Sequence, residues 1–176
     1  MIHGKVDTEG LSFELRLEDV ETLNRLAITG VLDISKVSYG ALPRLFPHYR
    51  VLDAGGALGK GVGPLFVSKK HLHLSELNPE NSTIVLPGAY TTAHLLFHLA
   101  HADFRNKIFL PFDQIEEALI QGQADAGIII HENRFTYAEK GLHKLEDLGD
   151  TWEHTTGFPI PLGGIIAKRH FSSATA

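Results

Sequence analysis

The sequence contains no cysteine, no long apolar run and no block of basic residues. Without cysteine, disulfides, thiolate metal ligands and a cysteine nucleophile are excluded within this chain. No apolar stretch approaches the roughly 20 residues needed to cross a bilayer, and no basic segment followed by an apolar one opens the sequence. We therefore expect a cytoplasmic protein that does not enter the membrane.

Charge and composition narrow the choice of partner. The 176 residues carry a formal net charge of -5, which disfavours a nucleic-acid surface because such surfaces bind phosphates through clustered Lys and Arg. Hydrophobic residues make up 43% of the chain, enough for a core in one domain or in two small lobes. A small molecule is the expected partner.

A short apolar run with a histidine at its end is the most informative stretch. Residues 113–121 have helical spacing of apolar positions, and Gly122 fits a left-handed helix stop. Residues 126–130 are continuously apolar, as in a strand of a parallel sheet covered on both faces. His131 follows where such sheets bind ligands, and its imidazole suits a general base. The alternative is a packed or hydrogen-bonded histidine without a function.

Polar residues also follow a second predicted strand, which comes after the first predicted helix. Residues 19–29 have the pattern of a helix, and residues 32–35 alternate as a short strand. Lys36, Val37 and Ser38 come next. By themselves they fit a solvated turn better than a ligand contact.

A third candidate site lies at the start of a helix. Residues 83–86 predict a strand, and Thr91 or Thr92 is expected to cap a helix that runs to about Ala102. The free amides of Thr92 and Ala93 could then hold an anionic or carbonyl group. Every helix needs a cap, so this signal is weak in isolation.

Three histidines of the same helix, His94, His98 and His101, share the spacing of a helical metal site. No carboxylate is interleaved with them as in the H-E-x-x-H motif. The leucines of this helix occupy a different arc: Leu95, Leu96 and Leu99. We therefore expect a solvated histidine face and no metal.

Glycine and proline mark two connections. Residues 55–64 (GGALGKGVGP) are not a P-loop, because Gly59-Lys60 is followed by Gly61 instead of Ser or Thr. They fit a crossover between two lobes. Residues 159–164 (PIPLGG) predict the return crossover.

Six ordered stretches together resemble one family, the 1,4-dihydroxy-6-naphthoate synthases of the futalosine route to menaquinone. The stretches are residues 19–25 (DVETLNR), 36–39 (KVSY), 55–64 (GGALGKGVGP), 87–93 (PGAYTTA), 125–137 (DAGIIIHENRFTY) and 159–169 (PIPLGGIIAKR). The resemblance implies an α/β fold of two lobes, like that of periplasmic solute-binding proteins. It further implies a ligand cleft between the lobes and neither a metal nor an organic cofactor.

The resemblance also divides the chain. We expect residues 1–82 and 165–176 to form the first lobe and residues 83–164 the second. Family members have an upstream strand and loop, and helices beyond the position of Arg169. The first lobe is therefore expected to be incomplete, with exposed apolar surface that favours self-association.

The family's activity is that of a lyase that converts cyclic dehypoxanthinyl futalosine to 1,4-dihydroxy-6-naphthoate and dihydroxyacetone. Its proposed general base is the histidine after the apolar strand, which corresponds to His131. Its ligand contacts correspond to Lys36, Val37, Ser38, Thr92 and Ala93. Glu132 and Arg134 are expected to brace the loop without touching the substrate.

Two other functions remain open. The first is a non-catalytic small-molecule binding protein of the same fold, which the missing upstream loop would favour. The second is the related chorismate dehydratase, although GGALGKGVGP and HENRFTY look more like the naphthoate synthase. His131, together with both ligand-contacting stretches, favours the lyase.

Overall fold

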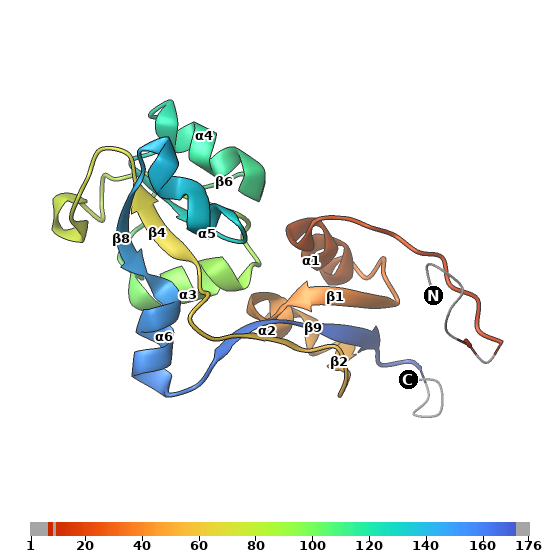
Figure 1. Ribbon diagram of the computed structural model, residues 1–176. Coiled ribbons are helices and arrows are strands. Elements are labelled where there is room, and N and C mark those ends of the chain that lie inside the picture. The colour runs from red at the N-terminus through yellow and green to blue at the C-terminus, as the bar shows by residue number, and fades with distance from the viewer. Residues whose placement is uncertain (1–6, 9, 172–176) are drawn as a thin grey trace.

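The computed structural model describes residues 7, 8 and 10–171, which form two α/β lobes joined by two crossovers (Figure 1). In the first lobe, three short strands pair antiparallel with one long strand. The short strands are β1 (Ile34–Ser38), β2 (Tyr49–Val51) and β3 (Ala57–Gly59), and the long strand is β9 (Ile160–Lys168). Because β1 runs through Ser38, the three residues Lys36, Val37 and Ser38 are strand positions and not a solvated turn.

The second lobe has a mixed five-stranded sheet in the order β6-β5-β7-β4-β8. Its strands are β4 (Leu65–Ser68), β5 (Ile84–Leu86), β6 (Lys107–Phe109), β7 (Ala126–Ile129) and β8 (His143–Asp147). The expected parallel arrangement holds for β5 with β6 and with β7, whereas β4 pairs antiparallel with β7 and β8. All four residues of β7 are buried, which confirms the strand predicted from its continuous apolar run.

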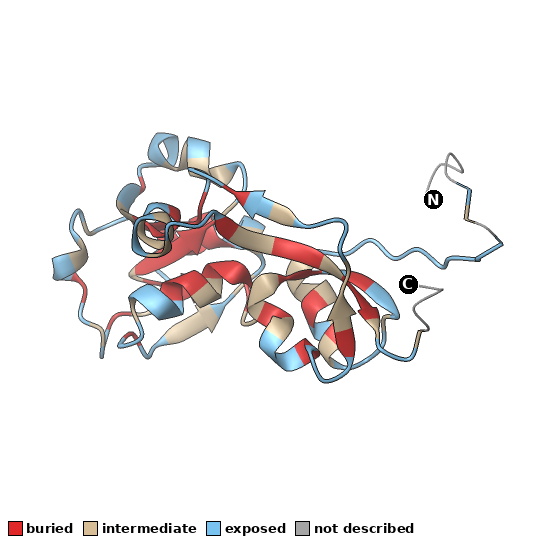
Figure 2. Cartoon of the chain, turned by 90° about the horizontal axis from the view of Figure 1, so that it is seen from below, coloured by how far each residue is buried: buried red, intermediate tan, exposed pale blue. Residues whose placement is uncertain are grey.

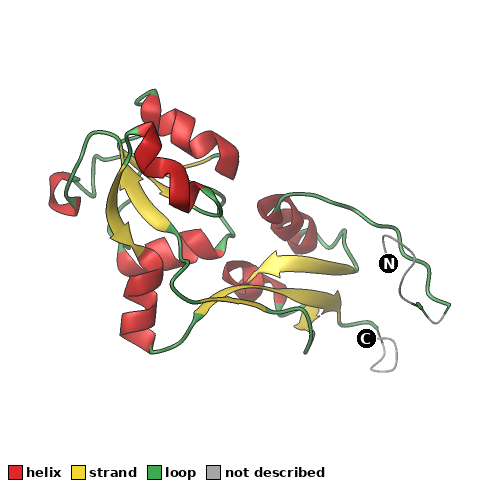
Figure 3. Ribbon diagram, viewed as in Figure 1, coloured by secondary structure: helices red, strands yellow, loops and turns green. Residues whose placement is uncertain are grey.

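Helices cover both faces of the second sheet and pack beside the first (Figure 3). The α-helices are α1 (Val20–Ile28), α2 (Leu42–Leu45), α3 (Thr92–Ala100), α4 (Ile115–Ile120), α5 (Asn133–Thr136) and α6 (Leu148–Thr156). The 3-10 turns are η1 (Tyr39–Ala41), η2 (Leu74–Glu76), η3 (Phe112–Gln114) and η4 (Tyr137–Lys140). None of the helices in the described ranges is long and apolar enough to span a membrane.

Local sequence signals account for where these helices start and stop. Asp19 caps α1 by accepting hydrogen bonds from the amides of Glu21 and Thr22, and Thr91 caps α3 by accepting from the amide of His94. Gly122 follows α4 with a φ of 72°, the left-handed conformation expected at a helix stop.

The apolar core is divided between the lobes (Figure 2). In the second lobe, Phe66 and Ile128 are fully buried on one side of the sheet and Ile115 and Leu119 on the other. Burial of each such side chain contributes about 1.5–3 kcal/mol to folding. The first lobe has its own smaller cluster around Tyr49.

The lobes were expected to meet at residues 82/83 and 164/165, but the strands are divided between the two sheets at other positions. β4 belongs to the second sheet, and β9 is in the first sheet from Ile160 onward. The crossovers therefore fall at residues 60–64 and 157–159. The difference arises because the apolar strand β4 gains partners on both edges only in the second sheet, between β7 and β8.

The histidines of α3 do not form one solvated face. His98 is exposed, but the ring of His94 is half-buried, and this burial lowers its pKa. His101 packs against Phe66, and its Nε2 lies 2.5 Å from Oε2 of Glu146. The expectation was wrong for His94 and His101 because α3 packs against both the sheet and α6.

An extended segment, residues 11–18, leads into α1 and projects away from both sheets (Figure 1). Its apolar side chains alternate along the chain, and all of them are exposed: Leu11, Phe13, Leu15 and Leu17. Such alternation is typical of a strand with one buried face. No strand of the described residues covers this face.

Candidate functional site between the two lobes

A cavity of about 240 Å³ lies between the lobes, and all six residues singled out in the sequence line it. They are Lys36, Val37 and Ser38 of β1, Thr92 and Ala93 of α3, and His131 after β7. The crossover residues Val62, Gly63 and Pro64 and the β9 residues Leu162 and Gly163 also line it. The volume is just below the roughly 300–1,000 Å³ typical of small-molecule sites.

His131 is held in an unusual backbone conformation at the end of β7. With a φ of 57°, it is the only non-glycine residue with a positive φ in the described ranges. Such a conformation costs of order 1 kcal/mol or more and persists where the surroundings impose it, often at functional sites. The exposed imidazole packs edge-on against Phe112, with 5.1 Å between ring centroids.

Alternation along β1 gives its last three residues different roles. The side chains of Lys36 and Ser38 lie on one face of the strand, and that of Val37 lies on the other. Val37 is fully buried in the core of the first lobe, so only its backbone can face the cavity. Lys36 is exposed, and Ser38 is buried.

The hydroxyl of Thr92 connects three segments at the junction of the lobes. It accepts a hydrogen bond from the amide of Gly40 at 3.2 Å. Its Oγ1 also lies 3.2 Å from the carbonyl oxygen of Pro161 and 3.0 Å from that of Leu162. Because this hydroxyl already has partners, the groups left for a ligand are the backbone amides of Thr92 and Ala93 in the first turn of α3.

Contacts between α1 and the segment before α3 hold the lobes together beside the cavity. The carboxylate of Glu21 accepts hydrogen bonds from the amides of Ala89 and Tyr90, both at 3.1 Å. The Tyr90 ring lies 5.8 Å from the guanidinium of Arg25 and 5.3 Å from that of Arg44. Both cations come from the first lobe, so Tyr90 is held by cation–π contacts across the junction.

The close approach of the lobes requires a glycine at position 40. A Cβ at Gly40 would lie 2.6 Å from the carbonyl oxygen of Thr91, well inside van der Waals contact. Gly40 thus allows η1 and the cap of α3 to touch beside the cavity.

Arg134 braces the cavity from outside. Its guanidinium donates to the carbonyl of Gly63 at 2.6 Å and to the carboxylate of Asp147 at 2.6 Å. Asp147 in turn accepts from the amides at the start of α6. Arg134 therefore braces the crossover that lines the cavity. That neither Arg134 nor Glu132 touches the substrate stays a prediction.

Sequence reasoning missed Glu21 and Asn24, two residues of α1 that reach the opposite lobe. Asn24 is fully buried and contacts both Ser38 and Tyr90. Spacing could have indicated them, since polar Glu21, Asn24 and Arg25 lie at i, i+3 and i+4 on one face of the helix. Their partners in the opposite lobe, Ala89 and Tyr90, however, are more than 60 positions away along the chain.

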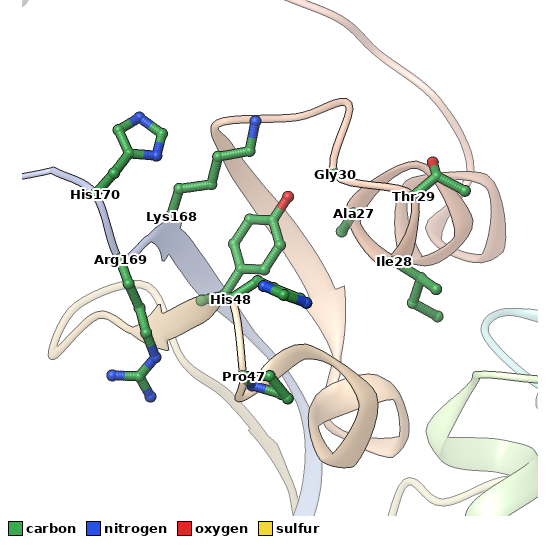
Figure 4. Close-up of a pocket in the computed structure, with 10 residues that line it drawn as sticks. Ala27, Ile28, Thr29, Gly30, Pro47, His48, Lys168, Arg169 and His170 are labelled. Atoms are coloured by element: carbon green, nitrogen blue, oxygen red, sulfur yellow. The ribbon is translucent and has the colours of Figure 1, made fainter.

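A larger cavity of about 530 Å³ lies at the outer end of the first lobe (Figure 4). It is lined by residues 27–30, 47–49 and 168–170 and contains none of the predicted site residues. Tyr49 donates from its hydroxyl to the carbonyl of Leu32, and the ammonium of Lys168 pairs with Asp33. Because these polar groups already have protein partners, the smaller cavity between the lobes is the better candidate site.

The two lobes and the cavity between them define a two-lobed α/β fold like that of solute-binding proteins. Solved structures share this fold, including the alkanesulfonate-binding protein from Xanthomonas axonopodis pv. citri bound to MOPS. It matches with a TM-score of 0.60 over 88% of this chain and 54% of that chain, at 16% identity. A binding protein component of a phosphonate transporter from Pseudomonas aeruginosa matches with a TM-score of 0.57 over 88% of this chain and 57% of that chain, at 15% identity.

The family model for menaquinone biosynthesis matches residues 1–176, and the chain belongs to this family. A 1,4-dihydroxy-6-naphthoate synthase from Streptomyces coelicolor is 41% identical over 174 residues, covering 96% of this chain and 60% of the relative. The enzyme of the same name from Thermus thermophilus is 43% identical over 169 residues, with the same coverage. The motif resemblance is thereby confirmed, and the chain spans about 60% of the length of these relatives.

A crystal structure of a protein from Archaeoglobus fulgidus gives a closer structural match than the solute-binding proteins. Its TM-score is 0.87 at 40% identity, and the match covers 98% of this chain and 63% of that chain. A TM-score this high over nearly the whole chain means that the likeness covers both lobes.

Proposed function

We propose that the chain is a carbon–carbon lyase that converts cyclic dehypoxanthinyl futalosine to 1,4-dihydroxy-6-naphthoate and dihydroxyacetone. The main support is the position of His131, an exposed imidazole in a strained backbone conformation on the wall of the cavity between the lobes. The names of the two curated relatives support the same activity.

In the proposed reaction, neutral His131 removes a proton from the substrate and so starts carbon–carbon cleavage. Negative charge that develops on a substrate oxygen is stabilised by the hydroxyl of Ser38 and by the amides of Thr92 and Ala93. Lys36, exposed beside the cavity, adds positive charge that favours an anionic substrate. These steps need acid–base chemistry and charge stabilisation only, and no metal or cofactor is part of the proposal.

The described residues contain no group of three or more His, Asp or Glu side chains suited to a metal ion. The charge stabilisation in the proposal is assigned to Ser38 and the amides of α3 because these groups line the cavity. The family and the site together also lead us to propose that the protein works in the cytoplasm on a small molecule, without nucleic acid.

A non-catalytic binding protein is the second candidate, favoured by the likeness of the fold to binding components of transporters. Fold alone does not separate the two functions, because one scaffold can support both. The related chorismate dehydratase ranks third, since the stretches at residues 55–64 and 131–137 resemble the naphthoate synthase more closely.

Product formation separates the lyase from the binding protein. The chain is incubated with cyclic dehypoxanthinyl futalosine, and 1,4-dihydroxy-6-naphthoate is measured by mass spectrometry, beside a His131→Asn variant. We expect naphthoate with the unaltered protein and at most a trace with the variant. Substrate binding without naphthoate in either sample would instead support a binding protein.

Self-association is a further expectation, supported by the exposed alternating side chains of residues 11–18. Apolar strand-like surface of this kind favours pairing with another chain. The sedimentation coefficient should therefore rise with protein concentration, and Leu15→Lys with Leu17→Lys should reduce that rise. A sharp, concentration-independent melting transition of a monomer would contradict the expectation.

A further inference from the structure

Asn24 lies behind the cavity, where α1 packs against the end of β1. The residue is fully buried, and its amide side chain makes three hydrogen bonds. Its Oδ1 accepts from the backbone amide of Ser38 at 2.9 Å. Its Nδ2 donates to Oγ of Ser38 at 3.1 Å and to the carbonyl of Tyr90 at 3.3 Å.

The two backbone partners determine which way the Asn24 amide points. The amide of Ser38 can only donate, so it must face Oδ1, and the carbonyl of Tyr90 can only accept, so it must face Nδ2. A flipped amide would lose both hydrogen bonds and place like groups against each other. The second proton of Nδ2 is therefore directed at Oγ of Ser38.

This orientation determines whether the hydroxyl of Ser38 can act as a hydrogen-bond donor toward a ligand. Its oxygen accepts the Asn24 proton, which leaves its single O–H free to donate elsewhere. Within the described residues, this O–H donates no hydrogen bond to a protein acceptor, and the one bond made by Oγ is the one that it accepts from Asn24. Ser38 also lines the cavity. The hydroxyl is thus prepared as a donor toward whatever occupies the cavity.

We propose that Asn24 is a positioning residue that fixes the Ser38 hydroxyl as a hydrogen-bond donor to a ligand oxygen that bears or develops negative charge. The inference rests on the proposed lyase function and assigns the direction of one proton within it. Because Tyr90 belongs to the second lobe, contact between the lobes adds a second constraint to the orientation that the Ser38 amide already imposes. Asn24 thereby connects the junction of the lobes to the direction in which the Ser38 hydroxyl donates its proton.

The test reverses the polarity of the side chain at position 24. Asn24→Asp keeps the size and the acceptor for the Ser38 amide, but its second oxygen can only accept. The Ser38 hydroxyl then donates to the carboxylate and no longer to the ligand. We expect kcat/KM to fall by about 100- to 1,000-fold, the cost of losing one donor to a developing oxyanion.

A double-mutant cycle with Ser38→Ala separates positioning from folding. If Asn24 acts through the Ser38 hydroxyl, Asn24→Asp lowers kcat/KM in the unaltered background and changes it little in the Ser38→Ala background. Asn81→Asp is the matched control, because it makes the same charge change at an exposed position and should leave kcat/KM within about twofold. Equal losses in both backgrounds would overturn the proposal.

A second variant and a binding assay keep the test possible if Asn24→Asp does not fold or if the chain shows no turnover. Asn24→Ala carries no buried charge, and the cycle is repeated with it if Asn24→Asp fails to fold by circular dichroism. If the unaltered chain binds naphthoate without turnover, the proposed lyase function fails. The double-mutant cycle is then carried out with the Kd for naphthoate, measured by naphthoate fluorescence, in place of kcat/KM. A chain that neither converts substrate nor binds naphthoate would overturn both proposals.

Discussion

Replacing His131 with asparagine is expected to lower kcat by about 100- to 10,000-fold and to leave the Kd for substrate nearly unchanged. A general base contributes in this range, and it acts on the barrier and not on ground-state binding. Asparagine is chosen because it tolerates a positive φ better than most residues, and His131 has a φ of 57°. Single-turnover rates and equilibrium binding measure the two quantities separately.

The matched control is His98→Asn, at an exposed histidine of α3 outside the lining of the cavity. Its kcat should equal that of the unaltered protein. A His131→Gly variant adds a second readout, since glycine adopts the same φ without strain. Added imidazole should then restore part of the rate as an external base. A loss that appears equally in Kd and in kcat/KM would show that His131 binds the substrate and is not its base.

Local pattern predicted the strand end that carries His131, and this residue lines the cavity between the lobes. Sheet membership, in contrast, differs from the predicted lobe boundaries. His131 could be predicted because the run at residues 126–130 is continuously apolar, which indicates a buried strand, and open sheets bind ligands at strand ends. Composition and local pattern suffice for such an inference. The positive φ of His131 could not be predicted, since residue pattern indicates an element and its end but not a single backbone angle.

Long-range partners account for the features that the sequence did not reveal. Residues 65–68 read as a strand in either lobe, and only pairing with both β7 and β8 assigns them to the second sheet. Asn24 reads as an ordinary polar position of an amphipathic helix until Ser38 and Tyr90 are brought to it. Local spacing predicts elements and their ends, whereas contacts between lobes depend on the whole fold.

The buried ion pair between Arg134 and Asp147 gives the largest expected effect on stability. The two side chains are 17% and 6% exposed, with 2.6 Å between Nη2 and Oδ2. Arg134→Met removes the cation and leaves a buried carboxylate without its partner, which typically costs about 3–5 kcal/mol. It also leaves the carbonyl of Gly63 without its donor. We therefore expect the free energy of unfolding, measured by urea denaturation, to fall by about 3 kcal/mol or more.

Arg16→Met is the matched control, because Arg16 pairs with Glu18 at 3.0 Å while the two side chains are 51% and 34% exposed. An exposed pair of this kind contributes about 0–1 kcal/mol, so the two variants should differ clearly. Adding Asp147→Asn to Arg134→Met removes the buried charge and keeps an oxygen that can cap α6, so part of the loss should return. Equal losses for Arg134→Met and Arg16→Met would mean that the bracing of the crossover contributes little to stability. Recovery of stability without recovery of kcat in the double variant would instead indicate that Arg134 is needed to hold residues 61–64 where they line the cavity.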